Sequence, residues 1–318
     1  MICLTSNPRS RKDLHDFFIQ QTNAEIKMGQ YSQSEPIVVV EGILDTKLID
    51  KLRNNKLTVI PIEKLIKATI KGYEERRKTK SARDLVKIVC DLFVKNNFKF
   101  VFGIRDADTY ALKEFIRHRK WNFSPKPNYI FDTRPCRDME TVLYSALFQC
   151  NRFLQGFPKK FDECVQRSEE LAYVGLGLHE FNRKDFIKGW NGGLKGFSDS
   201  YRYNRQSYYD LCECSEKIAD AFIEFHKNRF SEESSYELKK IVADKKLIIK
   251  QTKIKWFELS RGHDLERMLQ YTNPNWDGRK LNELLIRLID YECLKNFQMF
   301  KSIQTWRTQN KVPALFRR

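Results

Sequence analysis

In the first half of the chain, short continuous apolar runs alternate with segments whose apolar residues recur at helical spacing. A continuous β-branched run such as Ile37-Val-Val-Val40 is typical of a strand buried on both faces of a parallel sheet. The pattern predicts strands at 37–40, 57–60, 98–104 and 128–131, and helices at 45–52, 81–97, 109–118 and 138–148. Strands that alternate with helices in this way indicate an α/β fold with a parallel sheet flanked by helices.

The pattern changes after about residue 150 and becomes mainly helical. Two later apolar runs, at 246–249 and 254–259, predict strands, and helices are expected from Arg261 and over 282–300. We therefore expect four regions: an N-terminal helical segment (1–35), an α/β domain (36–150), a mainly helical region (151–245) and a C-terminal strand–helix region (246–318).

Composition and charge narrow the class of partner. Of 318 residues 41% are hydrophobic, which is enough for a substantial core, and Lys plus Arg exceed Asp plus Glu by 58 to 41. A net charge of +17 favours polyanions, which bind with release of counterions. The sequence contains no run of about 18 apolar residues and no signal-peptide core, so we expect a cytoplasmic protein without membrane association.

The eight cysteines do not indicate a metal site. They are scattered along the chain and form no C-x-x-C pair, so reduced thiols are expected rather than zinc ligands.

Carboxylates follow two of the predicted strands at their carboxyl ends. Glu41 comes directly after Val38-Val-Val40, and Asp106 and Asp108 follow the strand that ends near Ile104. Functional groups of open α/β sheets gather at this edge. If the backbone stays extended, Asp106 and Asp108 point the same way, and Gly42 permits a sharp turn after Glu41.

Three such carboxylates in a small volume repel one another unless a cation lies between them. Oxygen ligands without His or Cys select a hard ion, Mg²⁺ or Mn²⁺, which stabilises charge in phosphoryl transfer. The sequence therefore predicts a metal site at which a basic chain holds a phosphate backbone.

The order Val38-Val-Val-Glu-Gly-x-x-Asp45 followed by a strand ending in Asp106-x-Asp108 is similar to the toprim signature. Topoisomerases, bacterial primases and the nucleases of the overcoming-lysogenisation-defect type share that domain. The resemblance covers about residues 36–145 and implies a toprim-like catalytic domain. It also implies an acid–base role for Glu41 and magnesium binding by Asp106 and Asp108.

A closer resemblance includes Asp132-Thr-Arg-x-x-Arg137-Asp138-Met-Glu140 and the late Arg261-Gly-His-Asp-Leu265. These motifs resemble the AriB-type toxic nucleases of the PARIS anti-phage defence system. The resemblance implies cleavage of tRNA during abortive infection, restraint by an ABC-type ATPase of the AriA kind, and a homodimer.

Several further residues are candidates. Glu140, one turn into its helix, is a fourth metal ligand candidate, whereas Asp45, Asp138 and His263 suit helix starts. Basic residues near the strand ends are expected to contact nucleic-acid phosphates, namely Arg105, Arg117, Arg119, Lys120 and Arg137.

Other functions remain open at this point. A topoisomerase needs a second domain with a nucleophilic tyrosine, and a primase is expected to carry a zinc module, so both are poorer interpretations. A DNA endonuclease of the overcoming-lysogenisation-defect type and a toprim-like binding module without catalysis are the alternatives.

Overall fold

The chain forms two compact units, each assembled from separate stretches of sequence. A computed structural model describes residues 11–29, 31–62, 65, 82–118, 129–152, 157–201, 203–272 and 278–317. Unit 1 comprises residues 1–106, 123–133 and 289–318, and unit 2 comprises residues 107–122 and 134–288. This division differs from the expected boundaries at 35, 150 and 245, because the C-terminal stretch joins the sheet and the helix after the last strand does not.

Unit 1 is built on a four-stranded parallel sheet. Its strands are β1 (Ile37–Val40), β2 (Thr58–Pro61), β3 (Val101–Arg105) and β4 (Ile130–Asp132), in the order β2-β1-β3-β4. Its helices are α1 (Arg11–Lys27), α2 (Ile43–Leu52), α4 (Ala82–Lys95), α15 (Tyr291–Leu294) and α16 (Gln298–Gln309). The predicted α/β class, with a parallel sheet flanked by helices, is confirmed.

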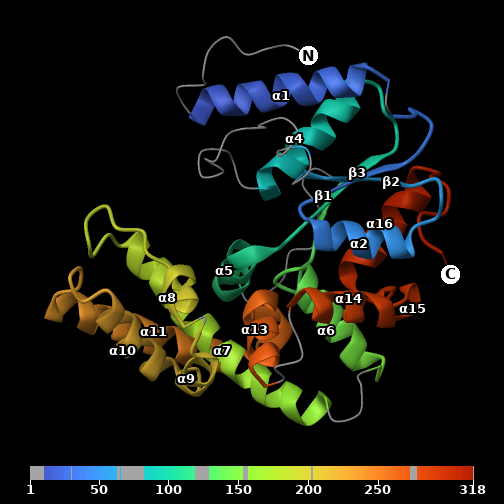
Figure 1. Cartoon of the computed structure of the whole chain (residues 1–318). Coiled ribbons are helices and arrows are strands. Elements are labelled where there is room, and N and C mark those ends of the chain that lie inside the picture. The colour runs from blue at the N-terminus through green and yellow to red at the C-terminus, as the bar shows by residue number, and fades with distance from the viewer. Residues whose placement is uncertain are drawn as a thin grey trace. The chain divides into compact units, whose positions relative to one another are not determined.

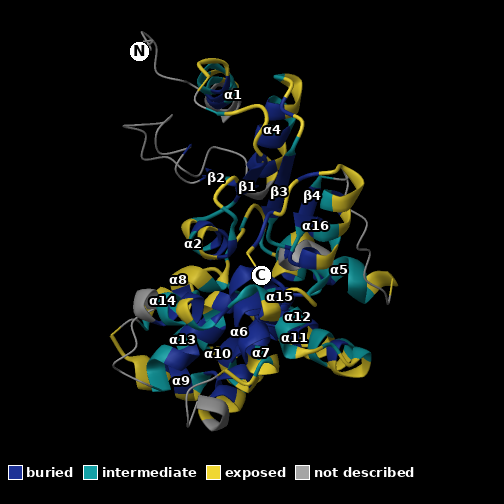
Figure 2. Cartoon of the chain, turned by 90° about the vertical axis from the view of Figure 1, so that its right-hand side faces the viewer, coloured by how far each residue is buried: buried dark blue, intermediate teal, exposed yellow. Residues whose placement is uncertain are grey.

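The central strands are buried on both faces, as their uninterrupted apolar runs predict (Figure 2). Ile37 and Val39 join a core cluster with Phe18 of α1 and Phe93 of α4. The alternate residues of these strands face the opposite side of the sheet. On that side, the ring centroids of Phe102 on β3 and Trp306 on α16 are 5.1 Å apart. Within this unit, α1 and α4 lie on one side of the sheet and α2 and α16 on the other (Figure 1).

Unit 2 is all helical in its described residues. Its helices are α5 (Asp108–His118), α6 (Met139–Gln149), α7 (Phe157–Arg183), α8 (Leu194–Ser200), α9 (Arg205–Leu211), α10 (Ser215–Phe225), α11 (Glu232–Thr252), α12 (Trp256–Leu259), α13 (Gly262–Thr272) and α14 (Gly278–Leu288). The long helix α7 packs against α10, α11, α12 and α13 and forms the centre of this unit.

Three predictions from the second half of the chain are wrong. Residues 246–249 continue α11, and 256–259 form the short helix α12, so neither run is a strand. The run Leu247-Ile-Ile249 lies one turn before the end of α11, where only Ile249 is buried and Leu247 is exposed. The helix expected over 282–300 is instead three helices, because Asp290 and Phe297 begin new ones.

No helix in the described ranges combines the length and apolar character that a bilayer crossing requires.

A carboxylate pair on α7 has unequal surroundings. Glu170 lies 2.8 Å from the Lys246 ammonium of α11 and accepts a hydrogen bond from the backbone N–H of Ser215. Burial, and then the charge of Glu170, raise the pKa of Glu169 to about 7, against the weaker opposing effect of Lys250. Deprotonation of Glu169 therefore destabilises the folded protein.

Gly103 allows α4 to approach β3. A Cβ at this position would lie 2.6 Å from Val86 Cγ1 and 2.8 Å from Ile130 Cδ1. We expect Gly103→Ala to destabilise the protein by about 1–3 kcal/mol in urea unfolding, because the core must shift to admit a methyl group. Gly196→Ala on α8, where a Cβ meets no atom within 4 Å, is the matched control and should be as stable as the parent or more stable by up to about 1 kcal/mol, because Ala favours a helix over Gly. Equal stability of both variants would contradict this packing.

The raised pKa of Glu169 predicts a pH-dependent stability difference. The folded pKa lies above the unfolded value, so the penalty is absent below about pH 4.5, grows through about pH 7 and is full above it. Glu169→Gln should match the parent at pH 4.5 and exceed it at pH 8 by on the order of 1 kcal/mol after allowance for solvent screening. Glu170→Gln, which loses the pair with Lys246, should be destabilised at pH 8. If Glu169→Gln were more stable than the parent at pH 4.5 but not at pH 8, the direction assigned to the pKa shift of Glu169 would be wrong.

Candidate active site

Glu41 and Asp106 lie side by side at one edge of the sheet. Since β1 pairs in parallel with β3, with Val40 opposite Ile104, the two strands end together. The backbone N–H of Asp106 donates to Oε1 of Glu41 at 2.8 Å. Both side chains are partly exposed. The neighbouring strands on which the expected site depended are therefore present.

Asp108 lies at the start of a helix. β3 ends at Arg105, Asp106 and Ala107 follow in the connection, and Asp108 is the first residue of α5. The strand therefore does not continue as far as Asp108, and the expected common direction of Asp106 and Asp108 stays a prediction. Its side chain lies outside the described part of the structure.

The turn after Glu41 needs no glycine. Gly42 is the N-cap of α2 in extended backbone (φ −126°, ψ 178°), and a Cβ there would meet only Asp45 Oδ2 at 3.7 Å. Asp45 is not the N-cap that the sequence suggested. It is the third residue of α2, and its carboxylate accepts a hydrogen bond from the backbone N–H of Gly42 at 2.9 Å. This contact fixes the start of α2 directly after Glu41.

The two late motifs of the sequence meet inside unit 2. Asp138 is the N-cap of α6, as expected, and its Oδ1 accepts the N–H of Thr141 at 2.9 Å. Its Oδ2 accepts the N–H of Gly262 at 2.8 Å, at the first residue of α13. One buried carboxylate thus caps two helices whose sequences are 124 residues apart. A Cβ on Gly262 would lie 2.1 Å from Cβ of Glu140, so only glycine fits there.

Arg137 strengthens the same junction. It is 5% exposed, donates from a guanidinium N–H to the carbonyl of Leu259 at 2.6 Å, and uses its backbone N–H to bind the carbonyl of Phe257. These contacts join the start of α6 to α12. Its expected role was a nucleic-acid contact, and the structure gives it this structural role.

Glu140 and His263 form an ion pair in unit 2. Nε2 of His263 lies 3.5 Å from Glu140, and Nδ1 lies 3.7 Å from Glu266. A hydrogen bond with Glu266, and then the charges of Glu140 and Asp138, raise the pKa of His263 to about 9. His263 is thus at the helix start that the sequence predicted, where its positive charge lies between two glutamates and offsets part of their charge.

The expected nucleic-acid contacts are distributed over both units. Arg105 ends β3 in unit 1, and Arg117 is an exposed residue in the last turn of α5 in unit 2. Arg119 and Lys120 lie outside the described residues.

The chemistry of the sheet edge suits a hard cation. Glu41 and Asp106 supply carboxylate oxygens, the ligands that Mg²⁺ and Mn²⁺ prefer. Among the described side chains, no three Asp, Glu, His or Cys groups are arranged to hold a metal ion. The implied third carboxylate, Asp108, is not among those side chains. Glu140, the candidate fourth ligand, belongs to unit 2, where its contact is His263.

Comparisons of the chain with protein-family models, with curated proteins and with solved structures give no match.

The double cap by Asp138 predicts a large loss of stability on truncation. We expect Asp138→Ala to cost about 2–4 kcal/mol in chemical unfolding, because two buried N–H donors lose a charged acceptor. Ser231→Ala removes the single cap of α11, a 3.2 Å bond to the N–H of Ser234, and should cost about 1 kcal/mol. A smaller loss for Asp138→Ala than for Ser231→Ala would show that Asp138 does not join the two helices.

Proposed function

We propose that the chain is a Mg²⁺-dependent nuclease of the toprim type. Glu41 serves as general acid or base, and Asp106 and Asp108 bind the metal, with Glu140 as a further candidate ligand. The observation that carries the proposal is the 2.8 Å hydrogen bond from the Asp106 N–H to Glu41 at the shared end of β1 and β3. It puts the first acid of the motif beside the second, although 65 residues separate them.

The residues of this edge have distinct tasks in the proposed reaction. The backbone N–H of Asp106 holds the Glu41 carboxylate in one orientation, as a proton-transfer group requires. Glu41 takes a proton from the attacking water or returns one to the leaving oxygen. The aspartates supply the hard oxygen ligands, and the cation, when bound, stabilises negative charge on the phosphate.

The substrate and partners follow from the charge and from the resemblance. A net charge of +17 suits a polyanionic substrate, and both RNA and DNA satisfy that condition. The resemblance to AriB-type nucleases favours tRNA, a toxic role in anti-phage defence, an ABC-type ATPase partner and a homodimer. The seven described cysteines are free thiols, which is compatible with the proposed cytoplasmic location.

The decisive variant is Glu41→Gln. Loss of the proton-transfer group should lower Mg²⁺-dependent cleavage of tRNA by at least about 100-fold and remove toxicity on expression. The matched control is Glu35→Gln, an exposed residue just before β1, which should cleave like the parent.

Two results would contradict the proposal. Parental cleavage by purified Glu41→Gln would exclude the assigned role. Absence of Mg²⁺ and Mn²⁺ binding in calorimetry of the parent, together with intact nucleic-acid binding, would favour the non-catalytic binding module. Sequencing of the broken ends of tRNA and DNA from expressing cells separates a tRNA nuclease from a DNA endonuclease.

A further inference from the structure

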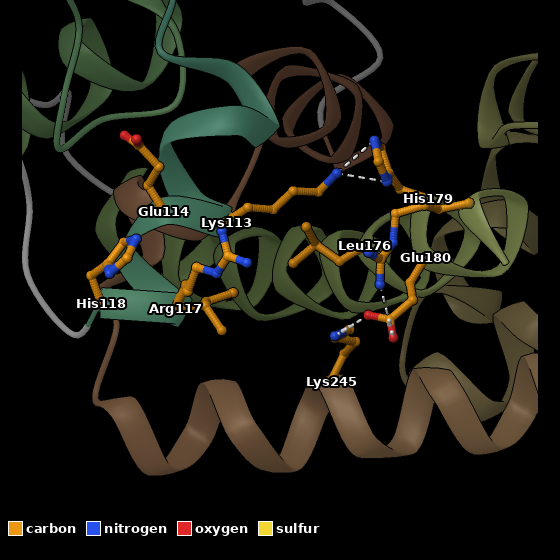
Figure 3. Close-up of a pocket in the computed structure, with 10 residues that line it drawn as sticks. Lys113, Glu114, Arg117, His118, Leu176, His179, Glu180 and Lys245 are labelled. Atoms are coloured by element: carbon orange, nitrogen blue, oxygen red, sulfur yellow. Dashed lines mark hydrogen bonds and ion pairs between the residues drawn. The ribbon is translucent and has the colours of Figure 1, made fainter.

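A basic cavity of about 540 Å³ lies within unit 2, between α5, α7 and α11 (Figure 3). Lys113 and Arg117 are four residues apart on α5 and share a face, as His179 and Arg183 do on α7. Lys245 enters from α11. The cavity residues are Lys113, Glu114, Ile116, Arg117, His118, Leu176, His179, Glu180, Arg183 and Lys245.

The carboxylates of the cavity already have cationic neighbours. Glu180 forms ion pairs with Lys245, with Lys184 at 3.5 Å and with Arg183 at 4.0 Å. Glu114 lies 3.6 Å from Arg134. The four Lys and Arg residues of the lining outnumber its two glutamates by two.

Lys113 faces a group that carries no negative charge. Its ammonium lies 2.6 Å from both ring nitrogens of His179, and it donates to the one that carries no hydrogen in the neutral ring (Figure 3). Burial, and then the charge of Arg183, lower the pKa of Lys113. Burial, and then the charge of Lys113, lower the pKa of His179. The positive charges of Lys113 and Arg183 therefore repel each other, against a weaker attraction to Glu180, and a bound anion would relieve that repulsion.

Size and shape favour a phosphate that carries a larger group. A cavity of this volume exceeds what a bare ion fills and lies in the range of small-molecule sites. Arginine guanidinium groups match phosphate oxygens in pairs, and Lys113 adds a point charge. Ile116 and Leu176 form an apolar wall suited to a sugar or a base.

We infer that this cavity binds the phosphate group of a nucleotide, and that the nucleotide belongs to the nucleic-acid strand that the enzyme cuts. The choice of a strand over a free nucleotide rests on the proposed function, whereas phosphate binding does not. Lys113 and Arg117 follow Asp108 on the same helix by five and nine residues, about 8 and 14 Å along its axis. A phosphate held here would align the strand relative to the first residue of α5.

Binding measurements in EDTA test the inference, because no metal is present and no cleavage occurs. The probes are a fluorescent 12-nucleotide RNA and AMP, titrated into the full chain. The test variant is Lys113→Gln with Arg183→Gln. The matched control is Lys240→Gln with Arg229→Gln, two exposed residues of unit 2 outside the cavity that carry the same charge change. Circular dichroism and thermal unfolding verify that both variants are folded.

We expect the cavity variant to bind RNA at least about 10-fold more weakly than the control at the same salt concentration. Its plot of log K against log salt should be shallower by about 1.4, which corresponds to two lost phosphate contacts on a single strand. Weakened AMP binding with unchanged RNA binding would show that the cavity binds a free nucleotide. It would overturn the inference that the phosphate belongs to a nucleic-acid strand. Equal binding of both probes by the cavity and control variants would overturn the site.

Failure of this inference and failure of the proposed function give different results. If the parent shows no nuclease activity but the Lys113→Gln, Arg183→Gln variant binds RNA more weakly, the phosphate site stands and the proposed function fails. A chain that loses cleavage through Glu41→Gln, yet shows no difference between the cavity and control variants, retains the active site alone.

Discussion

The parallel pairing of β1 with β3 is the constraint on which unit 1 depends. It aligns Val40 with Ile104, so that Glu41 and Asp106 leave the sheet at one edge and are joined by a hydrogen bond. The same pairing puts Ile37 and Val39 on the face covered by α4, where Gly103 permits close approach. A shift of one residue in this register would exchange the two faces of β1 and separate the acids. Core packing and site geometry thus depend on one set of backbone hydrogen bonds.

The sheet was predictable because its strands are short apolar runs separated by segments with helical spacing. The order of the strands was not predictable from any single run, since neighbours are chosen by packing across the whole sheet. Glu41 and Asp106 were predicted as partners on the condition that β1 and β3 are adjacent, and this condition is met. The direction of the Asp108 side chain stays a prediction, and α5 begins at Asp108, one residue earlier than the pattern suggested.

The second half of the chain shows where local patterns fail. The apolar run at 246–249 has strand composition, but its position in a 21-residue helix follows from packing of α11 on α7, a contact that local sequence does not contain. Asp138 and Gly262 were recognised as motif residues, but their hydrogen bond spans 124 positions and has no local signal. The basic cavity did have a local signal in the sequence, because Lys113 and Arg117, like His179 and Arg183, are four residues apart on one helix.

The ring of Trp306 completes the second face of the sheet, where it packs 5.1 Å from Phe102 and 6.3 Å from Phe131, measured between ring centroids. Trp306 belongs to α16, which is synthesised after all four strands of the sheet. A nascent chain that has reached only β4 therefore leaves these two aromatic rings without their cover. The sheet that carries Glu41 and Asp106 therefore gains the cover of this face only after the residues of unit 2 have been synthesised.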